Sequence, residues 1–172
     1  MASLPSSKFS CLFVVTGVLC AGQSERAAAR GWADYYATEY RVPPELVHAI
    51  IEVESAWQAH AISTKGAAGL MQLMPATAVT FGVTNRFEVE QNIRGGVAYL
   101  ARLLKLFNGD LRLVTAAYVA GENRILSAGL QYSNAEVFEY VSKVARLYQQ
   151  KRLKRLRTEP HAEIANKGGN SP

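Results

Sequence analysis

The sequence predicts an all-α fold, on two observations. Helical periodicity dominates the chain after its first 22 residues, and no run of residues alternates apolar and polar side chains as a strand would. Of the 172 residues, 49% are apolar and 19% are charged, which is typical of one globular domain with a buried core. No internal repeat is visible, and we expect the domain to cover residues 27–157.

The first two predicted helices cover residues 27–40 and 43–55. The first carries the aromatic residues Trp32, Tyr35, Tyr36 and Tyr40. The second opens on Pro43 and Pro44, because proline is tolerated in the first turn of a helix. Residues 58–69 are rich in Ala, Ser, Thr and Gly and predict a loop.

Three more helical stretches follow at residues 71–81, 90–107 and 111–120. An Asn-Gly-Asp turn at 108–110 separates the second stretch from the third, and Gly121 ends the third. The 111–120 stretch is apolar nearly all round, so we expect it to lie at the centre of the domain.

The last long helix is predicted to begin at Ser133 and to end near Arg155. Ser133 and Glu136 have the three-residue spacing of a capping box. Residues 158–172 are polar, contain two adjacent glycines and show no apolar periodicity, so we expect a disordered tail there.

Residues 1–22 predict a signal peptide. One positive charge, Lys8, precedes an apolar run that is too short to span a bilayer, and two small residues follow that run. A buried N-terminal helix is the alternative. A lipoprotein acylated at Cys20 is disfavoured, because Leu19 stands where such signals need a small residue. We therefore expect an exported protein of the periplasm or cell envelope.

Cysteine content and charge narrow the classes of function. Both cysteines, Cys11 and Cys20, lie in the predicted signal, so the mature chain would have no disulfide, no thiolate nucleophile and no cysteine metal site. The formal net charge of +5 favours anionic wall polymers and lipid headgroups as neighbours outside the cytoplasm, and it does not indicate nucleic acid for an exported chain. The three histidines show no metal-ligand spacing, and we expect no metal and no cofactor.

Glu54 carries the strongest chemical signal of the second predicted helix. A projection at 100° per residue places four apolar residues on one arc of about 140° and puts Glu54 in the middle of it. The four are Leu46, Val47, Ile50 and Ile51. Burial disfavours the charged form of a carboxyl and raises its pKa, as a general acid near neutral pH requires. A helix-end carboxylate bonded to backbone is the alternative.

The segment after this helix offers polar groups to a polymer. Ser63 precedes a stretch at 65–75 in which Gln72 is the one amide among apolar residues. Its side chain has both a donor and an acceptor for a sugar or an N-acetyl group. Neighbouring glycines allow a polymer to approach the backbone closely. A structural turn that leads into an amphipathic helix explains the same residues.

Four blocks of the chain resemble the lytic transglycosylases of the soluble-lytic-transglycosylase (SLT) type. They are Glu-Ser-Ala-Trp at 54–57, 66–75 with its Gly-Leu-Met-Gln core, 92–100, and Ala-Ala-Tyr-Val-Ala-Gly at 116–121. Their order and spacing carry the resemblance, which runs from residue 36 to residue 148. It implies a lysozyme-like catalytic domain of the goose type and peptidoglycan glycan strands as the substrate.

The resemblance assigns roles to single residues. It makes Glu54 the catalytic acid and base. The implied substrate-binding residues are Ser63, Met71, Gln72, Tyr118 and Tyr140. Of these, Tyr140 would reach back towards Glu54, and Met71 would belong to the core while touching substrate.

Other family positions are assigned to structure. They are Asn92, Gly96, Tyr99 and Leu100, interpreted as a helix start and its packing face. Trp57 is interpreted as packing in preference to sugar stacking. Two positions depart from the family pattern: Val119 stands where asparagine is usual and removes a polar cleft contact, and Val137 stands where threonine is common.

The resemblance also implies the reaction. Protonated Glu54 would donate to the oxygen between N-acetylmuramic acid and N-acetylglucosamine and then accept the proton of the muramic C6 hydroxyl, giving a 1,6-anhydro end. Hydrolytic glycosidases generally use two carboxyl groups. No second acid stands out, because Asp110 lies in a turn and Glu88 and Glu90 begin a helix. A hydrolytic muramidase and a non-catalytic peptidoglycan-binding protein are the alternatives.

The basic segment Lys-Arg-Leu-Lys-Arg-Leu-Arg at 151–157 admits two interpretations. One is a solvated helix end that complements the helix dipole. The other is peripheral contact with a membrane surface, an anionic wall polymer or a partner protein. A secretion or conjugation machine is a further partner that the resemblance allows.

Overall fold

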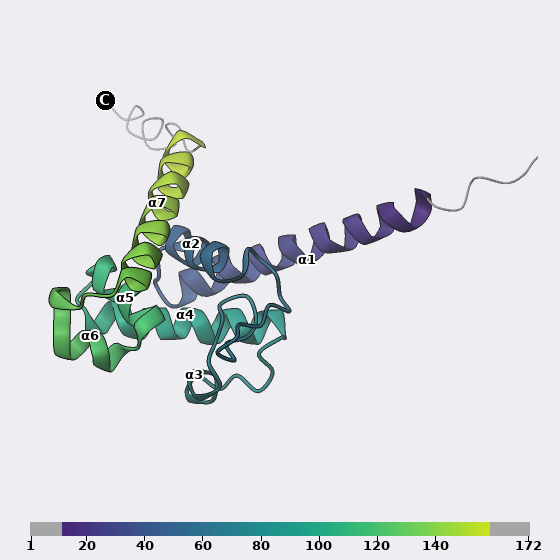
Figure 1. Cartoon of the computed structure of the whole chain (residues 1–172). Coiled ribbons are helices and arrows are strands. Elements are labelled where there is room, and N and C mark those ends of the chain that lie inside the picture. The colour runs from purple at the N-terminus through teal and green to yellow at the C-terminus, as the bar shows by residue number, and fades with distance from the viewer. Residues whose placement is uncertain (1–11, 159–172) are drawn as a thin grey trace, which may run out of the picture.

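The computed structural model describes residues 12–158 of the chain. In order, the elements are α1 (Leu12–Glu39), α2 (Pro44–Ser55), α3 (Pro75–Thr80), α4 (Val89–Leu106), α5 (Leu111–Ala120), α6 (Glu122–Ala128), the 3₁₀ helix η1 (Gly129–Gln131) and α7 (Ala135–Thr158). Within this range strand pairing is limited to isolated bridges from Ala68 to Ile62 and to Leu73. The all-α fold class is therefore confirmed (Figure 1).

The helices pack around one main core. Helix α2 packs against α1 and α7, α4 against α1 and α5, and α5 against α6 and α7. The largest fully buried side chains include Leu46, Ile50, Ile51, Leu70, Met71, Leu73, Ile93, Leu100 and Leu103. The beginning of α1 and the end of α7 project from this body in different directions (Figure 1).

Helix α2 matches its prediction closely and positions the candidate catalytic residue. Pro44 lies in the first turn, and the predicted apolar arc, from Leu46 to Ile51, is buried. Ala56 adopts the left-handed conformation with φ 49° and ends the helix, while its N–H donates to the Glu52 carbonyl. Glu54 therefore lies in the last turn, at the end of the buried stripe.

Asn92 of α4 fixes the loop that follows α2. Its Nδ2 donates to the carbonyls of Ala68 at 3.0 Å and Arg86 at 2.7 Å, and its Oδ1 accepts from the Met71 N–H at 2.8 Å. One turn later, Gly96 leaves room for Met71, since a Cβ atom at Gly96 would lie 2.4 Å from the Met71 sulfur. The structural roles predicted for Asn92 and Gly96 are confirmed.

Several helix limits differ from the prediction. Helix α1 begins at Leu12 instead of residue 27. Helix α3 begins at Pro75 instead of residue 71, because Gln72 adopts a left-handed conformation with φ 47° that a helix does not accept. Helix α6 and η1 were not predicted. Gly121, with φ 93°, both ends α5 and begins α6.

The structure describes only part of the predicted signal peptide. Residues 12–22 of the predicted signal peptide form the beginning of α1, and residues 1–11 lie outside the described residues. Export stays a prediction. Helix α5 was expected to lie at the centre of the domain, and only part of it does. Val114, Thr115 and Ala117 are buried, whereas Val119 is 44% exposed.

Helix α7 begins with a different cap from the one predicted. The Oδ1 of Asn134 accepts a hydrogen bond from the Val137 N–H at 3.0 Å, so the predicted Ser133 capping box is wrong. Helix α7 includes Thr158, which the predicted tail had contained. The rest of that tail, 159–172, lies outside the described residues.

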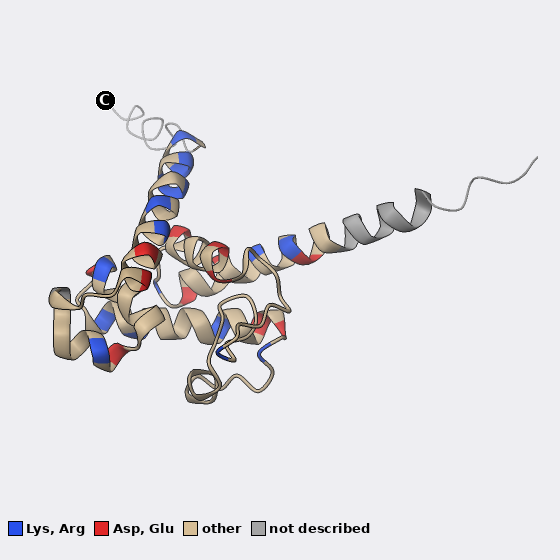
Figure 2. Ribbon diagram, viewed as in Figure 1, with Lys and Arg blue, Asp and Glu red and all other residues tan. Residues whose placement is uncertain are grey.

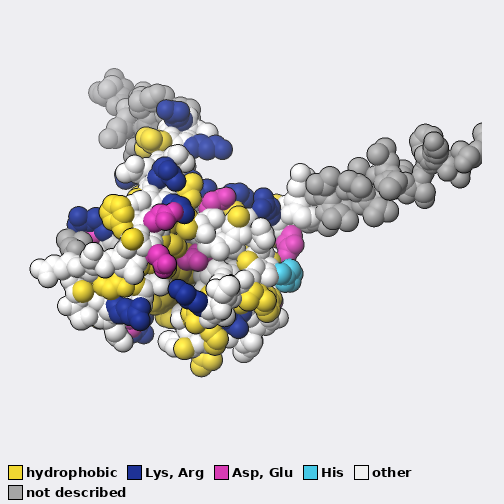
Figure 3. All heavy atoms as spheres, viewed as in Figure 1, with side chains coloured by type: hydrophobic (Ala, Val, Ile, Leu, Met, Phe, Trp, Pro, Cys, Tyr) yellow, Lys and Arg dark blue, Asp and Glu magenta, His cyan; other side chains and the backbone are white. Residues whose placement is uncertain are grey.

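The end of α7 carries a concentration of charge. Lys and Arg residues crowd its C-terminal half (Figure 2), and hydrophobic side chains lie among them on the projecting end (Figure 3). Leu153 and Leu156 are 56% and 63% exposed. In the part of the chain that the structure describes, no helix is long and apolar enough to cross a membrane.

Candidate active site

Glu54 of α2 faces Tyr140 of α7. The Tyr140 hydroxyl donates to Glu54 Oε1 at 2.6 Å, across a sequence separation of 86 residues. The packing of α2 against α7 brings the two together. Among the described residues, Glu54 Oε2 accepts no hydrogen bond, which leaves this oxygen for a ligand.

The Glu54 carboxyl is tuned for proton exchange near neutral pH. Burial raises its pKa to about 7, and the hydrogen bond from Tyr140 opposes this shift. A carboxyl with this pKa can donate a proton in one step and accept one in the next. The direction of this shift agrees with the direction that the helical projection predicted.

Two neutral tyrosines surround this carboxyl. Burial, and then the charge of Glu54, raise the hydroxyl pKa of both Tyr118 and Tyr140 well above the ordinary range. The Tyr118 hydroxyl donates to the Met71 carbonyl at 2.8 Å. Both tyrosines therefore act as hydrogen-bond donors at any physiological pH, as the resemblance implied for Tyr140 beside Glu54.

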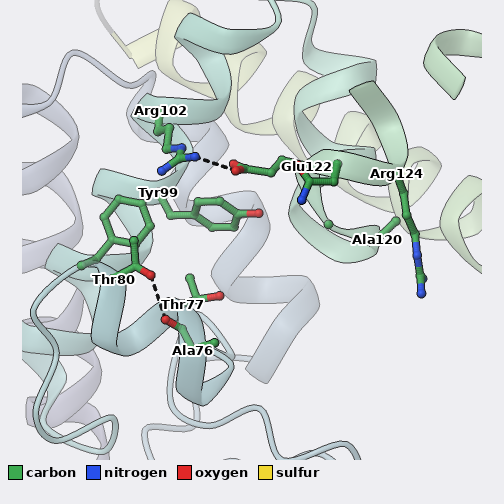
Figure 4. A pocket seen from close by; sticks show the side chains of 11 residues that line it. Ala76, Thr77, Thr80, Tyr99, Arg102, Ala120, Glu122 and Arg124 are labelled. Carbon is green, nitrogen blue, oxygen red and sulfur yellow. Dashed lines mark hydrogen bonds and ion pairs between the residues drawn. The ribbon is translucent and has the colours of Figure 1, made fainter. Parts of the chain in front are cut away.

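A groove opens beside Tyr118 and continues between α3, α4 and the beginning of α6. Figure 4 shows the far part of this groove. Its near part is lined by Gln72, Tyr118 and Val119, and its far part by Thr80, Arg102, Glu122 and Arg124. Both parts share Thr77 and Tyr99, which makes the groove continuous. Glu54 does not line the groove itself, and Tyr118 connects the two.

Tyr99 and the ion pair above it dominate the far part of the groove. In Figure 4 the Tyr99 ring lies between Thr77 and the pair formed by Arg102 and Glu122, whose Nη2 and Oε1 atoms are 2.6 Å apart. The Tyr99 ring also contacts the Tyr118 ring, with centroids 5.3 Å apart. This tyrosine, which the sequence had assigned to packing, is thus also a groove residue.

No sequence motif pointed to Arg102 or Glu122. One signal was available, because Tyr99 and Arg102 have the spacing that places two residues on the same face of a helix. Glu122 follows directly after the last block of the family resemblance. Glu122 reaches Arg102 of α4 only through the tertiary fold, in which α5 packs against both α4 and α6.

Gln72 lines the groove, and part of its amide is already engaged. Its Nε2 donates to the carbonyls of Ala61 at 3.0 Å and Gly69 at 2.8 Å. In the described part of the chain its Oε1 accepts no hydrogen bond. The carbonyl oxygen is therefore the atom that Gln72 offers to a ligand.

Ser63 and Met71 have structural positions. The Ser63 hydroxyl accepts from the Ala67 N–H at 3.0 Å and closes the turn at 63–67, and Ser63 is not among the residues that line the groove. The Met71 side chain is 0% exposed. The predicted substrate contact of Met71 therefore does not fit the structure: its side chain fills the core, and its carbonyl holds Tyr118.

Trp57 packs in the interior, which confirms its interpretation. It is 4% exposed, and its Nε1 donates to Glu52 Oε2 at 2.8 Å. The guanidinium of Arg30 lies 4.4 Å from the ring centroid. A sugar has no access to this ring.

Metal binding is not indicated in the region that the structure covers. Among residues 12–158 no group of three or more His, Cys, Asp or Glu side chains is arranged to hold a metal ion. The expectation that no metal and no cofactor take part stays a prediction.

Comparison with known proteins identifies the family. The family model described as "Transglycosylase SLT domain" matches residues 32–141, a range that includes Glu54, Gln72, Tyr118 and Tyr140. The chain belongs to the SLT transglycosylase family. The resemblance that four sequence blocks suggested is thereby confirmed.

Related proteins are also named as transglycosylases. The chain is 42% identical to the transglycosylase of Enterobacteria phage PRD1 over 88 residues, which are 51% of this chain and 33% of the phage protein. It is 34% identical to membrane-bound lytic murein transglycosylase D of Escherichia coli K12 over 103 residues, or 56% of this chain and 23% of that protein. The matched region thus spans a third or less of these relatives.

Solved SLT structures share the fold. An inactive glutamate-to-glutamine variant of lytic transglycosylase Slt from Pseudomonas aeruginosa aligns with a TM-score of 0.63 and 30% identity, covering 72% of this chain and 24% of that one. The 70 kDa soluble lytic transglycosylase Slt70 of Escherichia coli gives 0.66 and 26%, covering 73% and 24%. The lysozyme-like fold of the SLT catalytic domain is confirmed.

Proposed function

We propose that this SLT protein is a peptidoglycan lytic transglycosylase, which cleaves between N-acetylmuramic acid and N-acetylglucosamine and leaves 1,6-anhydro-muramic ends. The observation that carries the proposal is the Glu54 carboxyl, with a pKa of about 7 and one oxygen held by Tyr140. Family membership supports the reaction class, since the relatives are named as transglycosylases. The inactive glutamate-to-glutamine variant of the Pseudomonas enzyme fits a single essential glutamic acid.

The reaction needs two proton transfers at one carboxyl. Protonated Glu54 donates to the glycosidic oxygen, the bond from C1 to that oxygen breaks, and the N-acetylglucosamine hydroxyl leaves. The carboxylate then accepts the proton of the muramic C6 hydroxyl as its oxygen bonds to C1. No water is consumed. Tyr140 holds Oε1 throughout, so Oε2 exchanges the proton in both steps.

The groove supplies binding for the glycan. The Gln72 Oε1 atom can accept from an N-acetyl N–H or a sugar hydroxyl, and the Tyr99 ring offers an apolar face. Val119, 44% exposed in the same wall, presents only methyl groups where the family pattern has an amide. We therefore propose glycan binding with one polar contact fewer than the family pattern provides.

A hydrolytic muramidase is the closest rival, and one observation bears on it. Glu122 is a second carboxylate in the groove, although its Oε1 is paired with Arg102 and its Oε2 is buried without a partner. A hydrolase would need such a carboxylate to activate water. The engaged and buried oxygens of Glu122 disfavour that role.

Two matched variants separate the rivals. Purified glycan strands are digested with the wild type, Glu54→Gln and Glu122→Gln, and the ends are identified by mass spectrometry. We expect Glu54→Gln to lose cleavage and Glu122→Gln to keep the anhydro product. Reducing muramic ends that disappear in Glu122→Gln would establish the muramidase, and undiminished cleavage by Glu54→Gln would end both proposals.

We propose export to the periplasm or cell envelope as the setting. The apolar run at 11–21 after Lys8 supports export, because it has the pattern of a signal peptide. Peptidoglycan, the proposed substrate, also lies outside the cytoplasm. A partner secretion or conjugation machine is part of the same proposal. Fractionation of cells that express the full chain tests the location, which we expect to be the envelope fraction.

A further inference from the structure

A second pocket lies between α1, α2 and α7, where the end of α7 leaves the body of the domain. Four cations and two carboxylates line it: Arg30, Lys151, Lys154, Arg155, Asp34 and Glu45. None of them lines the groove beside Tyr118 or takes part in the proposed reaction. The pocket therefore has a surplus of two positive charges that the glycan chemistry does not use.

Both carboxylates of the pocket are already engaged. Asp34 Oδ1 lies 2.8 Å from Nε2 of His48, and Glu45 Oε1 lies 3.0 Å from Nη1 of Arg155. Burial lowers the pKa of His48, so its ring is neutral at pH 7 and adds no further positive charge. Asp34 keeps its full negative charge beside the neutral ring, so the pocket retains a net surplus of two positive charges.

Three cations face the pocket without a carboxylate partner. In the part of the chain that is described, Arg30, Lys151 and Lys154 form no ion pair, and the Arg30 guanidinium lies over the Trp57 ring. Burial lowers the pKa of Lys151, Glu52 opposes that shift, and the charges of Arg30 and Lys154 add to it. Like charges brought together in this way repel, and a bound anion relieves the repulsion.

We propose that this pocket binds a phosphomonoester group. Such a group carries about −1.5 to −2 charges at pH 7, which matches the surplus of the pocket, and its three oxygens accept hydrogen bonds. The ammonium groups of Lys151 and Lys154 each present three donors, and Arg30 adds its guanidinium. A carboxylate ligand would neutralise only half of the surplus. The group can belong to a soluble ester or to a lipid headgroup.

Titration with inorganic phosphate, followed by calorimetry, tests the site in the full chain. The double variant Lys151→Gln/Lys154→Gln removes two charges from the pocket. The control Arg152→Gln/Arg157→Gln removes two charges from the same helix, at positions that do not line the pocket. We expect the pocket variant to bind phosphate at least about tenfold more weakly than the wild type, and the control to stay within about twofold.

Two results would overturn the proposal. One is an equal loss of affinity in both double variants, which would show a general effect of helix charge. The other is a wild type that binds no phosphate. Circular dichroism of both variants serves as the folding control and is expected to match the wild type. The binding result is therefore independent of the proposed enzymatic function.

The source of the phosphate is distinguished with vesicles. Sedimentation with vesicles that contain phosphatidic acid is compared with titration by glycerol phosphate. A lipid ligand predicts that the wild type sediments with the vesicles and that the pocket variant does not. A soluble ligand predicts binding of glycerol phosphate with no retention by vesicles. Vesicle binding that both double variants share equally would contradict the pocket as the lipid site.

Discussion

At the residue scale, Glu54 is subject to two opposing influences. Burial favours its neutral form, and the hydrogen bond from the Tyr140 hydroxyl favours its charged form. Burial is the larger influence, which leaves the pKa near 7. Tyr140 therefore has two effects that can be separated: it orients the carboxyl and it limits the rise of the pKa.

Replacement of Tyr140 by phenylalanine tests these two effects. We expect the pKa of Glu54 to rise above about 7, so the alkaline limb of the pH profile of kcat/KM should move to higher pH. Activity at the optimum should fall about tenfold to a hundredfold, because the carboxyl is no longer oriented. Circular dichroism verifies the fold. An alkaline limb that moves to lower pH would contradict the proposed arrangement.

Glu54 should also destabilise the fold at neutral pH. Its pKa in the folded state, about 7, lies above the ordinary value of 4.5, so the unfolded chain ionises this group more readily. Folding is therefore penalised progressively as pH rises from 4.5 to 7, and fully above pH 7. We expect Glu54→Gln to raise the free energy of unfolding by about 1 to 3 kcal/mol at pH 8.

The same comparison has a built-in control. Near pH 4 the wild-type carboxyl is largely protonated in both states, so Glu54→Gln and the wild type should unfold with similar free energies in urea. A stabilisation that does not change between pH 4 and pH 8 would show that ionisation of Glu54 is not its cause.

Val119 offers a gain-of-function test in the groove. An amide placed at this position by Val119→Asn would add a hydrogen-bonding group beside Gln72 and Tyr118. We expect kcat/KM on glycan strands to rise about threefold to tenfold, the equivalent of one hydrogen bond. Replacement of exposed Val79, which lies outside the groove, by asparagine is the control and should leave kcat/KM unchanged. A lower rate for Val119→Asn would show that the valine is adapted to its substrate.

At the element scale, the contact between α4 and the loop after α2 places the groove wall. Gly96 allows Met71 to lie against α4, and the Met71 carbonyl in turn holds Tyr118. The next residue in the loop is Gln72, whose side chain lines the groove. A shift of Met71 should therefore disturb the groove, although no residue of α4 forms a hydrogen bond with the Glu54 carboxyl.

Gly96→Ala tests this connection. The added methyl would lie 2.4 Å from the Met71 sulfur and 2.8 Å from its Cβ, so Met71 must move. We expect a loss of about 1 to 3 kcal/mol in stability by urea unfolding and lower glycan cleavage. The control is Gly31→Ala in α1, where the methyl meets nothing within 4 Å and should stabilise the helix by about 0.5 to 1 kcal/mol. Unchanged activity in Gly96→Ala would contradict the proposed link from Gly96 through Met71 to the groove.

Helices were predicted correctly where the local sequence signals for their ends and apolar faces were strong. Helix α2 has prolines at its start and a clear apolar arc, and its limits were correct. Helix α6 was missed because one glycine, Gly121, serves as the end of one helix and the beginning of the next, so no loop separates them in sequence. The cap of α7 was placed one residue early, since Ser133 and Asn134 both have side chains that can cap a helix.

At the scale of the whole molecule, the site joins residues that are far apart in sequence. The burial of Glu54 was predictable from the periodicity of a single helix, and so was the direction of its pKa shift. The partner Tyr140 came only from the family resemblance, because local sequence does not reveal which helices pack together. The far part of the groove, with its pair of Arg102 and Glu122, was not predicted for the same reason.

The most direct test of the proposed function is the chemistry of the glycan ends. Strands digested by the wild type are separated and their muramic termini identified by mass spectrometry, with Glu54→Gln as the negative control. A single carboxyl that serves as both acid and base predicts 1,6-anhydro-muramic termini, which vanish in Glu54→Gln. Reducing muramic termini from the wild type, or cleavage that survives in Glu54→Gln, would contradict it.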